Sequence, residues 1–184
     1  GETLPYYVFD PAIWKEDSIY YAVTGGRTNT GPGNKAMRST SLFSSQDLKI
    51  WKYEHNFMKN ECFLPPGEDA SCPYFWPIGN RYIFLFFSHT TGSQYLLGDY
   101  NKEEHCFYPT FHGRFNFMSF LPGGVHAPSA TSDGEGGVIV IHNMHTGKKS
   151  PGWRGITTLP RKLTLDKCDT INIQPYGDYK SLRT

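Results

Sequence analysis

Charge is scarce in this sequence, and neither sign predominates. Of the 184 residues, 18 are Lys or Arg and 17 are Asp or Glu, so the formal net charge is +1. Surfaces that bind nucleic acid or anionic membranes need clustered positive charge, and this balance gives no reason to expect either partner. The longest apolar run, residues 82–87, is far shorter than the ~20 residues that span a bilayer. No leader of charged and then apolar residues opens the sequence, so the compartment stays undetermined.

Metal-binding and nucleotide-binding patterns are also missing. Four cysteines are present: Cys62, Cys72, Cys106 and Cys168. They lack Cys-x-x-Cys spacing, which argues against zinc, and a chain of this length needs no disulfide framework. His142 and His145 are three residues apart, a spacing that puts them on opposite faces of a strand. No glycine-rich loop that would hold phosphate precedes a helical pattern. We therefore expect no metal and no cofactor.

Aromatic residues are abundant, with 12 Tyr, 13 Phe and 4 Trp making up 16% of the chain, beside 19 Gly and 13 Pro. Glycine and proline interrupt helices, whereas aromatic side chains suit pleated surfaces. No long stretch shows a sustained apolar period of 3.6 residues. The composition predicts an all-β protein with many turns. The length suits one domain over residues 1–184.

Three similar hairpins recur along the chain. Each starts with a residue before proline, passes through a charged or glycine-rich turn and returns as an apolar strand; they cover residues 10–23, 72–87 and 127–141. Their prolines, at positions 11, 73 and 128, lie 62 and 55 residues apart, which suits one four-stranded propeller blade per repeat. Outer strands would follow, as at residues 40–43 and 50–53. We predict a partial β-propeller with blades at about 6–62, 63–122 and 123–184.

Three blades leave a propeller open. Rings close with about 4–8 blades, and closure removes exposed sheet edges. We expect either further blades on sequence that is not present here or association of two or more copies to cover the open flanks.

Carboxylates lie near the predicted inner strands. Asp10 stands in an aromatic setting directly before Pro11, and Glu61, Glu68 and Asp69 precede the second hairpin. Asp10 either caps local backbone amides or points into the central channel to bind or act on a sugar. The other three are either exposed loop charges or members of the carboxylate pair that glycoside hydrolysis requires.

Aromatic and histidine side chains give three further candidates for sugar binding. Trp76 and Trp153 are candidates for stacking against the apolar face of a sugar, although most such rings pack between blades. Trp153 is the better of the two because glycines and a proline flank it. His126 is expected at the start of a channel-facing strand, where a neutral ring would bind a hydroxyl.

Five motifs in order resemble glycoside hydrolase family 32, the group of invertases, levanases and inulinases. The resemblance runs from about residue 6 to the end and implies a five-bladed β-propeller that acts on fructose-containing sugars. The motifs are Val8-Phe9-Asp10-Pro11, Ser45-Gln46-Asp47-Leu48-Lys49-Ile50-Trp51, Cys72-Pro73-Tyr74-Phe75-Trp76-Pro77-Ile78, Gly124-Val125-His126-Ala127-Pro128-Ser129-Ala130, and Gly152-Trp153 with Leu159-Pro160-Arg161-Lys162-Leu163.

The resemblance also implies roles for individual residues. The family's Arg-Asp-Pro carboxylate, which binds sugar hydroxyls and stabilises the transition state, falls on Asp10, with Phe9 in place of the arginine. The acid/base position falls on Ser71, and serine does not protonate a leaving group at neutral pH. Glu68 and Asp69, two to three residues upstream, are the candidates to replace it. Glu61-Cys62 reproduces the family's dipeptide without the strand that follows it, so it ranks lower.

The family's nucleophile segment, Asn-Asp-Pro-Asn, does not occur in this sequence. We therefore predict a propeller that acts on or binds fructose-containing oligosaccharides or polysaccharides and is not catalytically complete alone. The alternative is a non-catalytic carbohydrate-binding module or self-assembling propeller fragment. A third possibility is another five-bladed glycosidase or glycan phosphorylase family. The expected partners are a fructoside ligand and a second copy of the chain or additional blades.

Overall fold

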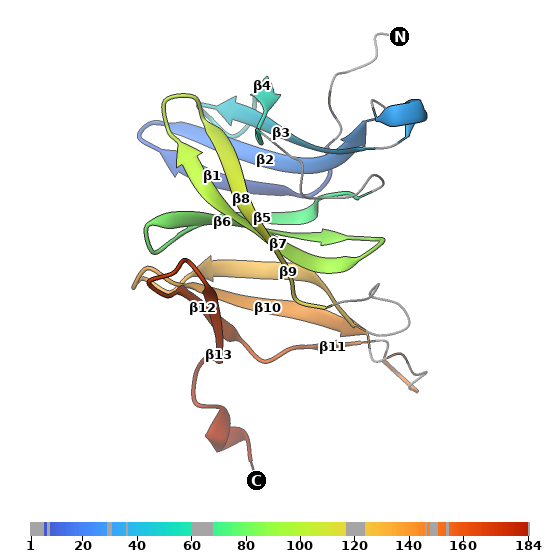
Figure 1. Ribbon diagram of the computed structural model, residues 1–184, viewed down its shortest axis with the longest axis vertical. Coiled ribbons are helices and arrows are strands. Elements are labelled where there is room, and N and C mark those ends of the chain that lie inside the picture. The colour runs from blue at the N-terminus through green and yellow to red at the C-terminus, as the bar shows by residue number, and fades with distance from the viewer. Residues whose placement is uncertain are drawn as a thin grey trace.

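The computed structural model describes residues 6, 8–28, 31–35, 37–59, 68–116, 124–145, 147, 151–153 and 155–183. Over these residues the chain forms three antiparallel sheets, stacked in chain order so that the two ends of the chain lie at opposite ends of the stack (Figure 1). The first sheet is β1 (Pro11–Glu16), β2 (Ile19–Thr28), β3 (Met37–Ser45) and β4 (Lys52–Asn56). The second is β5 (Ser71–Ile78), β6 (Arg81–Ser88), β7 (Gly92–Asn101) and β8 (Cys106–Arg114).

The third sheet has β9 (Gly124–Ser132), β10 (Val138–His145), β12 (Arg161–Leu165) and β13 (Ile171–Pro175), with the short β11 (Ile156–Thr157) beside the end of β10. Two 3-10 turns complete the elements: η1 (Pro32–Asn34) and η2 (Tyr179–Leu182). Among the described residues, no helix is long and apolar enough to cross a membrane.

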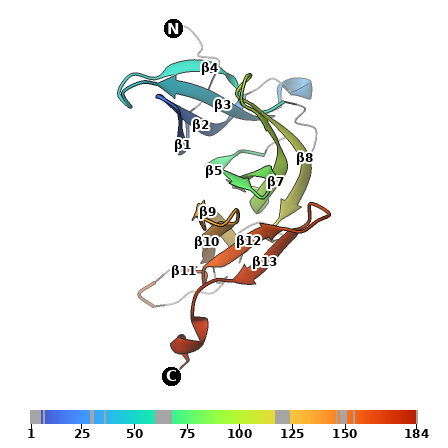
Figure 2. The same ribbon diagram turned by 90° about the vertical axis from the view of Figure 1, so that its left-hand side faces the viewer.

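The three predicted hairpins are the first two strands of each sheet. We call β1, β5 and β9 the inner strands; Figure 2 shows them one above another, and β5 contacts both of the others. Pro11 is the first residue of β1, but β5 and β9 begin two and four residues before Pro73 and Pro128, respectively. The sequence did not predict these early starts, because proline normally interrupts a ladder except at edges and bulges.

The same irregularity recurs in β5 and β9. Cys72 and Ala127, the residues before Pro73 and Pro128, have positive φ values of 50° and 44°. The pairing with β6 shifts register between Ser71 and Tyr74, and the pairing of β9 with β10 shifts beside Ala127. Each is a β-bulge in which one extra residue lets the proline enter the strand and turns the neighbouring side chains. Strained positions of this kind often lie beside functional sites.

Two apolar cores fill the spaces between the sheets. The first, between the first and second sheets, contains Val23, Leu42, Phe57, Met58, Ala70, Phe75, Phe84, Phe86, Leu96 and Phe107. The second, between the second and third sheets, contains Ile78, Ile83, Leu85, Leu97, Val138, Val140 and Leu163. Alternate residues of β6 point to opposite faces, so Phe84 and Phe86 enter the first core, whereas Ile83 and Leu85 enter the second. β6 is therefore the wall that both cores share.

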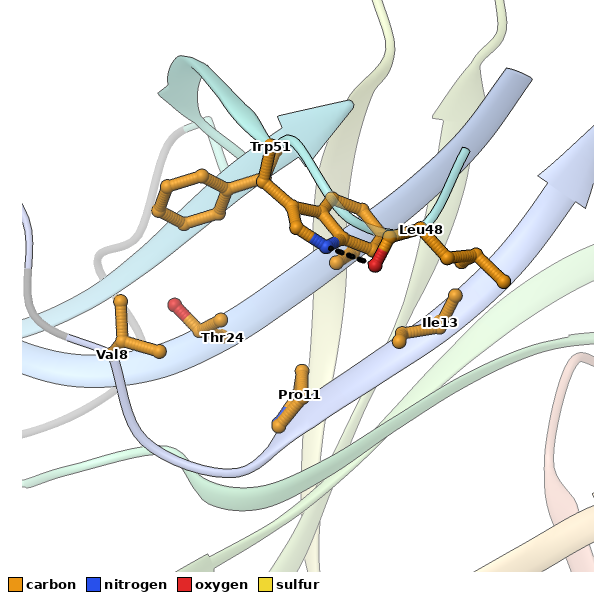
Figure 3. A pocket seen from close by; sticks show the side chains of 8 residues that line it. Val8, Pro11, Ile13, Thr24, Leu48 and Trp51 are labelled. Atoms are coloured by element: carbon orange, nitrogen blue, oxygen red, sulfur yellow. Dashed lines mark hydrogen bonds between the residues drawn. The ribbon is translucent and has the colours of Figure 1, made fainter. Parts of the chain in front are cut away.

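The outer face of the first sheet is apolar as well. Along β1, Trp14 points toward the second sheet and packs on Phe75, while Pro11 and Ile13 point the other way. With the indole of Trp51, which donates to the carbonyl of Leu48 at 3.3 Å, they border an open pocket of about 400 Å³ (Figure 3).

The Ser45–Trp51 motif forms the turn between β3 and β4. The carboxylate of Asp47 accepts hydrogen bonds from the backbone amides of Lys49 and Ile50, each at 2.9 Å, and these bonds lower its pKa. The turn therefore holds Ile50 and Trp51, and β4 begins only at Lys52. The predicted outer strand at 50–53 was placed two residues too early, because the side-chain bonds of Asp47 compete with strand pairing.

Candidate functional site

Asp10 joins the beginnings of two inner strands. It lies exposed directly before β1, and its Oδ2 accepts hydrogen bonds from the backbone amide of Cys72 at 3.3 Å and from the Cys72 thiol at 3.4 Å. Burial first, and then the bond to Asp10, raise the pKa of Cys72 to about 12. The thiol therefore stays protonated at neutral pH and donates to the carboxylate.

Asp69 forms a second acidic position beside Cys72, and its negative charge also contributes to the raised pKa of that thiol. Its Oδ1 accepts from the backbone amide of His89 at 3.1 Å, and its Oδ2 lies 2.7 Å from His89 Nδ1. The Asp69 side chain is only 6% exposed, whereas that of His89 is 64% exposed. Nδ1 donates to the carboxylate, so Asp69 fixes the orientation of an imidazole that solvent reaches.

Glu68 points into the second sheet. It is 1% exposed, and its carboxylate accepts from the Thr91 hydroxyl at 2.6 Å and from the Gln94 amide at 3.4 Å. Gln94 in turn accepts a hydrogen bond from His112 Nε2 at 2.6 Å. These bonds satisfy the buried carboxylate and tie the residues before β5 to β7 and β8.

The third sheet contributes His126, near the start of β9. Its ring centroid lies 5.4 Å from that of Phe87 on β6 and 4.6 Å from that of His145 on β10, with which it stacks. Burial, followed by the proximity of His145 and His89, lowers the pKa of His126, so the ring is neutral at pH 7.

These contacts connect the three sheets at one end of their inner strands. The hydrogen bond of Asp10 to Cys72, the pairing of Ser71 with Phe87, and the Phe87–His126 ring contact follow one another across the stack. We call this row the inner rim; it consists of Asp10, Asp69, Cys72, Phe87, His89 and His126.

The sequence-predicted candidates lie on the rim, in the interior and, for Trp153, on the exposed surface. Asp10, Asp69 and His126 lie on the inner rim. Trp76 is partly buried against the second core, and Trp153 is exposed between β10 and β11. Ser71, which the sequence resemblance aligned with the family's acid/base position, is buried where β5 pairs with β6. Glu61 lies outside the described residues. The roles predicted for these side chains stay predictions.

His89 was missed. No role was assigned to it from the sequence, because no local motif connects it to a carboxylate 20 residues earlier. The signal available was a histidine directly after a long apolar strand. Within the described part of the chain, no cluster of three or more His, Cys, Asp or Glu side chains is placed to hold a metal ion.

The chain matches the family model described as "Glycosyl hydrolases family 32 N-terminal domain" over residues 6–175. It is 27% identical over 176 residues to a sucrose-6-phosphate hydrolase of Zymomonas mobilis, covering 85% of this chain and 33% of that protein. It is 28% identical over 193 residues to a protein of the same name from Vibrio alginolyticus, covering 95% of this chain and 37% of the relative. The chain thus spans about a third of the length of these curated relatives.

Solved structures agree on the fold. The GH32 β-fructofuranosidase of Bombyx mori superimposes with a TM-score of 0.71 at 24% identity, covering 95% of this chain and 38% of that chain. A variant of the same enzyme, solved in complex with sucrose, superimposes with a TM-score of 0.69. The expectation of an all-β chain that forms about three blades of an incomplete propeller is confirmed.

Proposed function

Because the chain belongs to glycoside hydrolase family 32, we propose that it binds saccharides that contain fructose at the inner rim and contributes part of a hydrolytic site. The observation that carries this proposal is the contact between Asp10 and Cys72, which places an exposed carboxylate where two inner strands meet. A carboxylate with a fixed orientation accepts two sugar hydroxyls well, and hydrogen bonds to charged groups are stronger than neutral ones. The names of the relatives and the sucrose complex support a fructoside as the ligand.

Asp69 is the first candidate for the proton-donating group, and Glu68 is the second. The carboxylate of Asp69 is bound to an imidazole that solvent reaches, whereas the carboxylate of Glu68 is bound to Thr91 and Gln94 in the interior. Glu68 and Asp69 lie three and two residues before Ser71, whose hydroxyl does not supply a proton at neutral pH.

We further propose that the 184-residue chain binds without turnover. Hydrolysis requires two carboxyl groups that flank the glycosidic bond. The sequence contains no Asn-Asp-Pro-Asn segment, and the resemblance to the family aligns Ser71 with the acid/base position. Carbohydrate binding without any part in hydrolysis is therefore the second candidate function for this chain, and Ser71 is the observation that favours it.

Calorimetry with sucrose, levan and inulin tests binding, and release of free fructose tests turnover. We expect Asp10→Asn to weaken binding about tenfold or more, because it removes a charge-assisted hydrogen bond. We expect Asp69→Asn to weaken it less, through the loosened His89. Asp17→Asn is the matched control, since Asp17 lies exposed in the turn at the other end of β1, with a φ of 52° that asparagine tolerates.

Equal affinities of wild type and Asp10→Asn for every saccharide would show that the inner rim is not the binding site. Fructose release by the isolated chain, lost in Asp69→Asn, would replace the binding role with a complete enzyme.

A further inference from the structure

Polar bonds join the second and third sheets at the end away from the inner rim, where β5 turns into β6. We call this the far end of the junction. There the backbone amide of Gly79 donates to the carbonyl of Gly136 at 2.8 Å. The Arg81 guanidinium lies 2.6 Å from the carboxylate of Asp169 and 2.7 Å from that of Asp99, and the Arg81 side chain is only 14% exposed. Because Gly136 and Asp169 belong to turns of the third sheet, these bonds cross from one sheet to the other.

Ring contacts join the same two sheets at the rim end. His126 on β9 lies against Phe87 on β6, with ring centroids 5.4 Å apart. His142 on β10 lies against Phe115, which follows β8, at 4.7 Å. His145, also on β10, stacks on His126 at 4.6 Å with the ring planes 21° apart. Three of these five rings are therefore imidazoles, whose charge depends on pH.

A fourth histidine faces these rings from the turn between β6 and β7. The ring centroid of His89 lies 4.8 Å from that of Phe87. Burial, followed by the proximity of His145 and then of His89, lowers the pKa of His126. Asp69, before β5, binds His89 and offsets a positive charge on that ring. We use the term histidine cluster for His89, His126, His142 and His145.

A fixed positive charge also lies beside the histidine cluster. Burial first, then Arg161 at the start of β12 and the proximity of His126, lower the pKa of His142 to about 4. A protonated ring in the packed junction therefore meets imidazoles and a guanidinium, whereas in a separated junction it meets water. Since like charges at such distances repel, each proton that enters the cluster makes the next one more costly.

Acid therefore favours separation of the two sheets at the rim end. Histidine is the side chain whose ordinary titration falls between pH 5 and 8. Because packing lowers the pKa values of His126 and His142, the separated state binds protons more tightly than the packed state, and its share rises as the pH falls. The contacts of Gly79 and Arg81 at the far end contain no histidine, so titration of imidazoles leaves that end joined.

We propose that the second and third sheets form a hinge that acid opens: protonation of the histidine cluster separates them at the inner rim, while Gly79 and Arg81 hold them together at the far end. The opening moves His126 away from Phe87 and divides the inner rim between the two sheets. This inference goes beyond the proposed function, because it holds for any ligand of the rim.

Distances between spin labels test the hinge in the full chain. The labels are attached to p-acetylphenylalanine, which spares the native cysteines, at exposed positions: Thr90 and Thr157 report the rim end, and Asn80 and Lys167 report the far end. By pulsed electron paramagnetic resonance we expect one distance for each pair at pH 7, and a second, longer distance at pH 5 for the rim pair alone. The ratio of open to closed molecules should rise about tenfold or more, because each unit by which packing lowers a histidine pKa shifts this equilibrium tenfold.

Removal of the titratable charge should keep the rim end closed. In the double variant His126→Gln and His142→Gln, each glutamine still offers a donor and an acceptor but gains no charge in acid. We expect this variant to lose most of the longer distance at pH 5. His55→Gln on β4, in the first sheet, is the matched control and should open as wild type does.

The far end is tested independently by Arg81→Gln, which removes the ion pair with Asp169. We expect this variant to show a longer distance between the labels at 80 and 167 already at pH 7. Lys52→Gln, which breaks an ion pair within the first sheet, is its control. An unchanged distance in Arg81→Gln would show that this ion pair does not hold the hinge.

The other outcomes separate the hinge from its rivals. A single rim distance at both pH values, or equal lengthening at both ends, would overturn the hinge. A longer rim distance that persists in the double variant would overturn the role of the histidine cluster. Circular dichroism at each pH distinguishes opening from unfolding, because a hinge leaves the strands intact. Loss of the β-sheet signal together with the appearance of the longer distance would overturn the proposal.

Discussion

His142 shows how burial of a single side chain makes stability depend on pH. It lies on β10, 3% exposed, with its ring centroid 4.7 Å from that of Phe115. Burial, then the charge of Arg161 and the proximity of His126, lower its pKa to about 4, whereas an unfolded histidine titrates near 6.5. Between these two pKa values His142 is protonated in the unfolded chain but neutral in the folded chain. The free energy of unfolding therefore falls as the pH falls.

We therefore expect acidification from pH 7 to pH 4 to cost about 3 kcal/mol of stability through His142 alone, lost between pH 6.5 and 4. His142→Gln removes this contribution and flattens the dependence. Urea unfolding at several pH values measures it, with His55→Gln on β4 as the matched control. An unchanged slope in His142→Gln would assign the acid sensitivity to other groups.

Cys72 reports on the contact that carries the proposed function. Burial and Asp10 raise the pKa of this thiol to about 12, so alkylation, which requires the thiolate, is slow at pH 8. We expect Asp10→Asn to speed alkylation of Cys72, because the substitution removes a negative charge and weakens an acceptor. Peptide mapping after timed iodoacetamide treatment measures the rate, with exposed Cys168 as the internal reference. Equal rates in wild type and Asp10→Asn would contradict the contact.

At the residue scale, the sequence was most informative where a motif is local. Asp10 and His126 lie beside the prolines that start their hairpins, and the structure places both on the inner rim. His89 had no such marker. It matters because Asp69 holds it across 20 residues. Pairings of this kind depend on tertiary structure, which local patterns do not encode.

At the scale of elements, Gly25 sets how closely β2 approaches the second sheet. A Cβ at this position would collide with the backbone carbonyl of Ala70, directly before β5. The backbone of Ala70 cannot shift without displacing its neighbour Asp69, which belongs to the inner rim.

We expect Gly25→Ala to destabilise the chain by about 3 kcal/mol, the upper end of overpacking penalties. Gly33→Ala is the comparison, because Gly33 has a φ of 65° in open space and its substitution costs only about 1 kcal/mol of backbone strain. Urea unfolding of both variants measures the difference. A Gly25→Ala that loses no more stability than Gly33→Ala would show that the two sheets separate easily.

The predicted elements were correct in type but short in extent. The predicted hairpins end at residues 23, 87 and 141, and β2, β6 and β10 each include the end of their hairpin. β2 continues through Gly25 and Gly26 to Thr28, and β10 continues to His145. Apolar runs mark the strand centres, whereas glycine and polar residues at the ends resemble turns until a partner strand pairs with them.

At the scale of the whole molecule, the outer face of the first sheet is an open flank. The pocket there is lined almost entirely by apolar groups, with Ile13 and Leu48 about half exposed: Val8, Pro11, Ile13, Ala22, Thr24, Phe43, Leu48 and Trp51 (Figure 3). The second sheet, in comparison, has both of its faces covered by its neighbours. Apolar surface of this kind favours association. In a purified sample of this chain, a second copy is the protein that can bury it.

We expect the purified chain to associate, with Ile13→Lys shifting the equilibrium toward the monomer because it places a charge in the apolar contact. Light scattering after size exclusion, across a dilution series, measures the mass. Ile50→Lys is the matched control, since Ile50 lies in the 46–50 turn outside this pocket. A mass of 20.9 kDa, that of the monomer, at every concentration would show that this apolar face does not drive association.

The shared wall formed by β6 has a consequence for cooperativity. Its side chains alternate between two cores, so neither core can loosen without releasing the same strand from its neighbours. Local opening is then cheap at the two outer sheets and requires global unfolding at the centre. Amide hydrogens of residues 83–87 should exchange with deuterium last. A substitution in either core should speed their exchange by the same factor as it raises the equilibrium constant for unfolding. The middle blade thus sets the unfolding free energy of the whole stack.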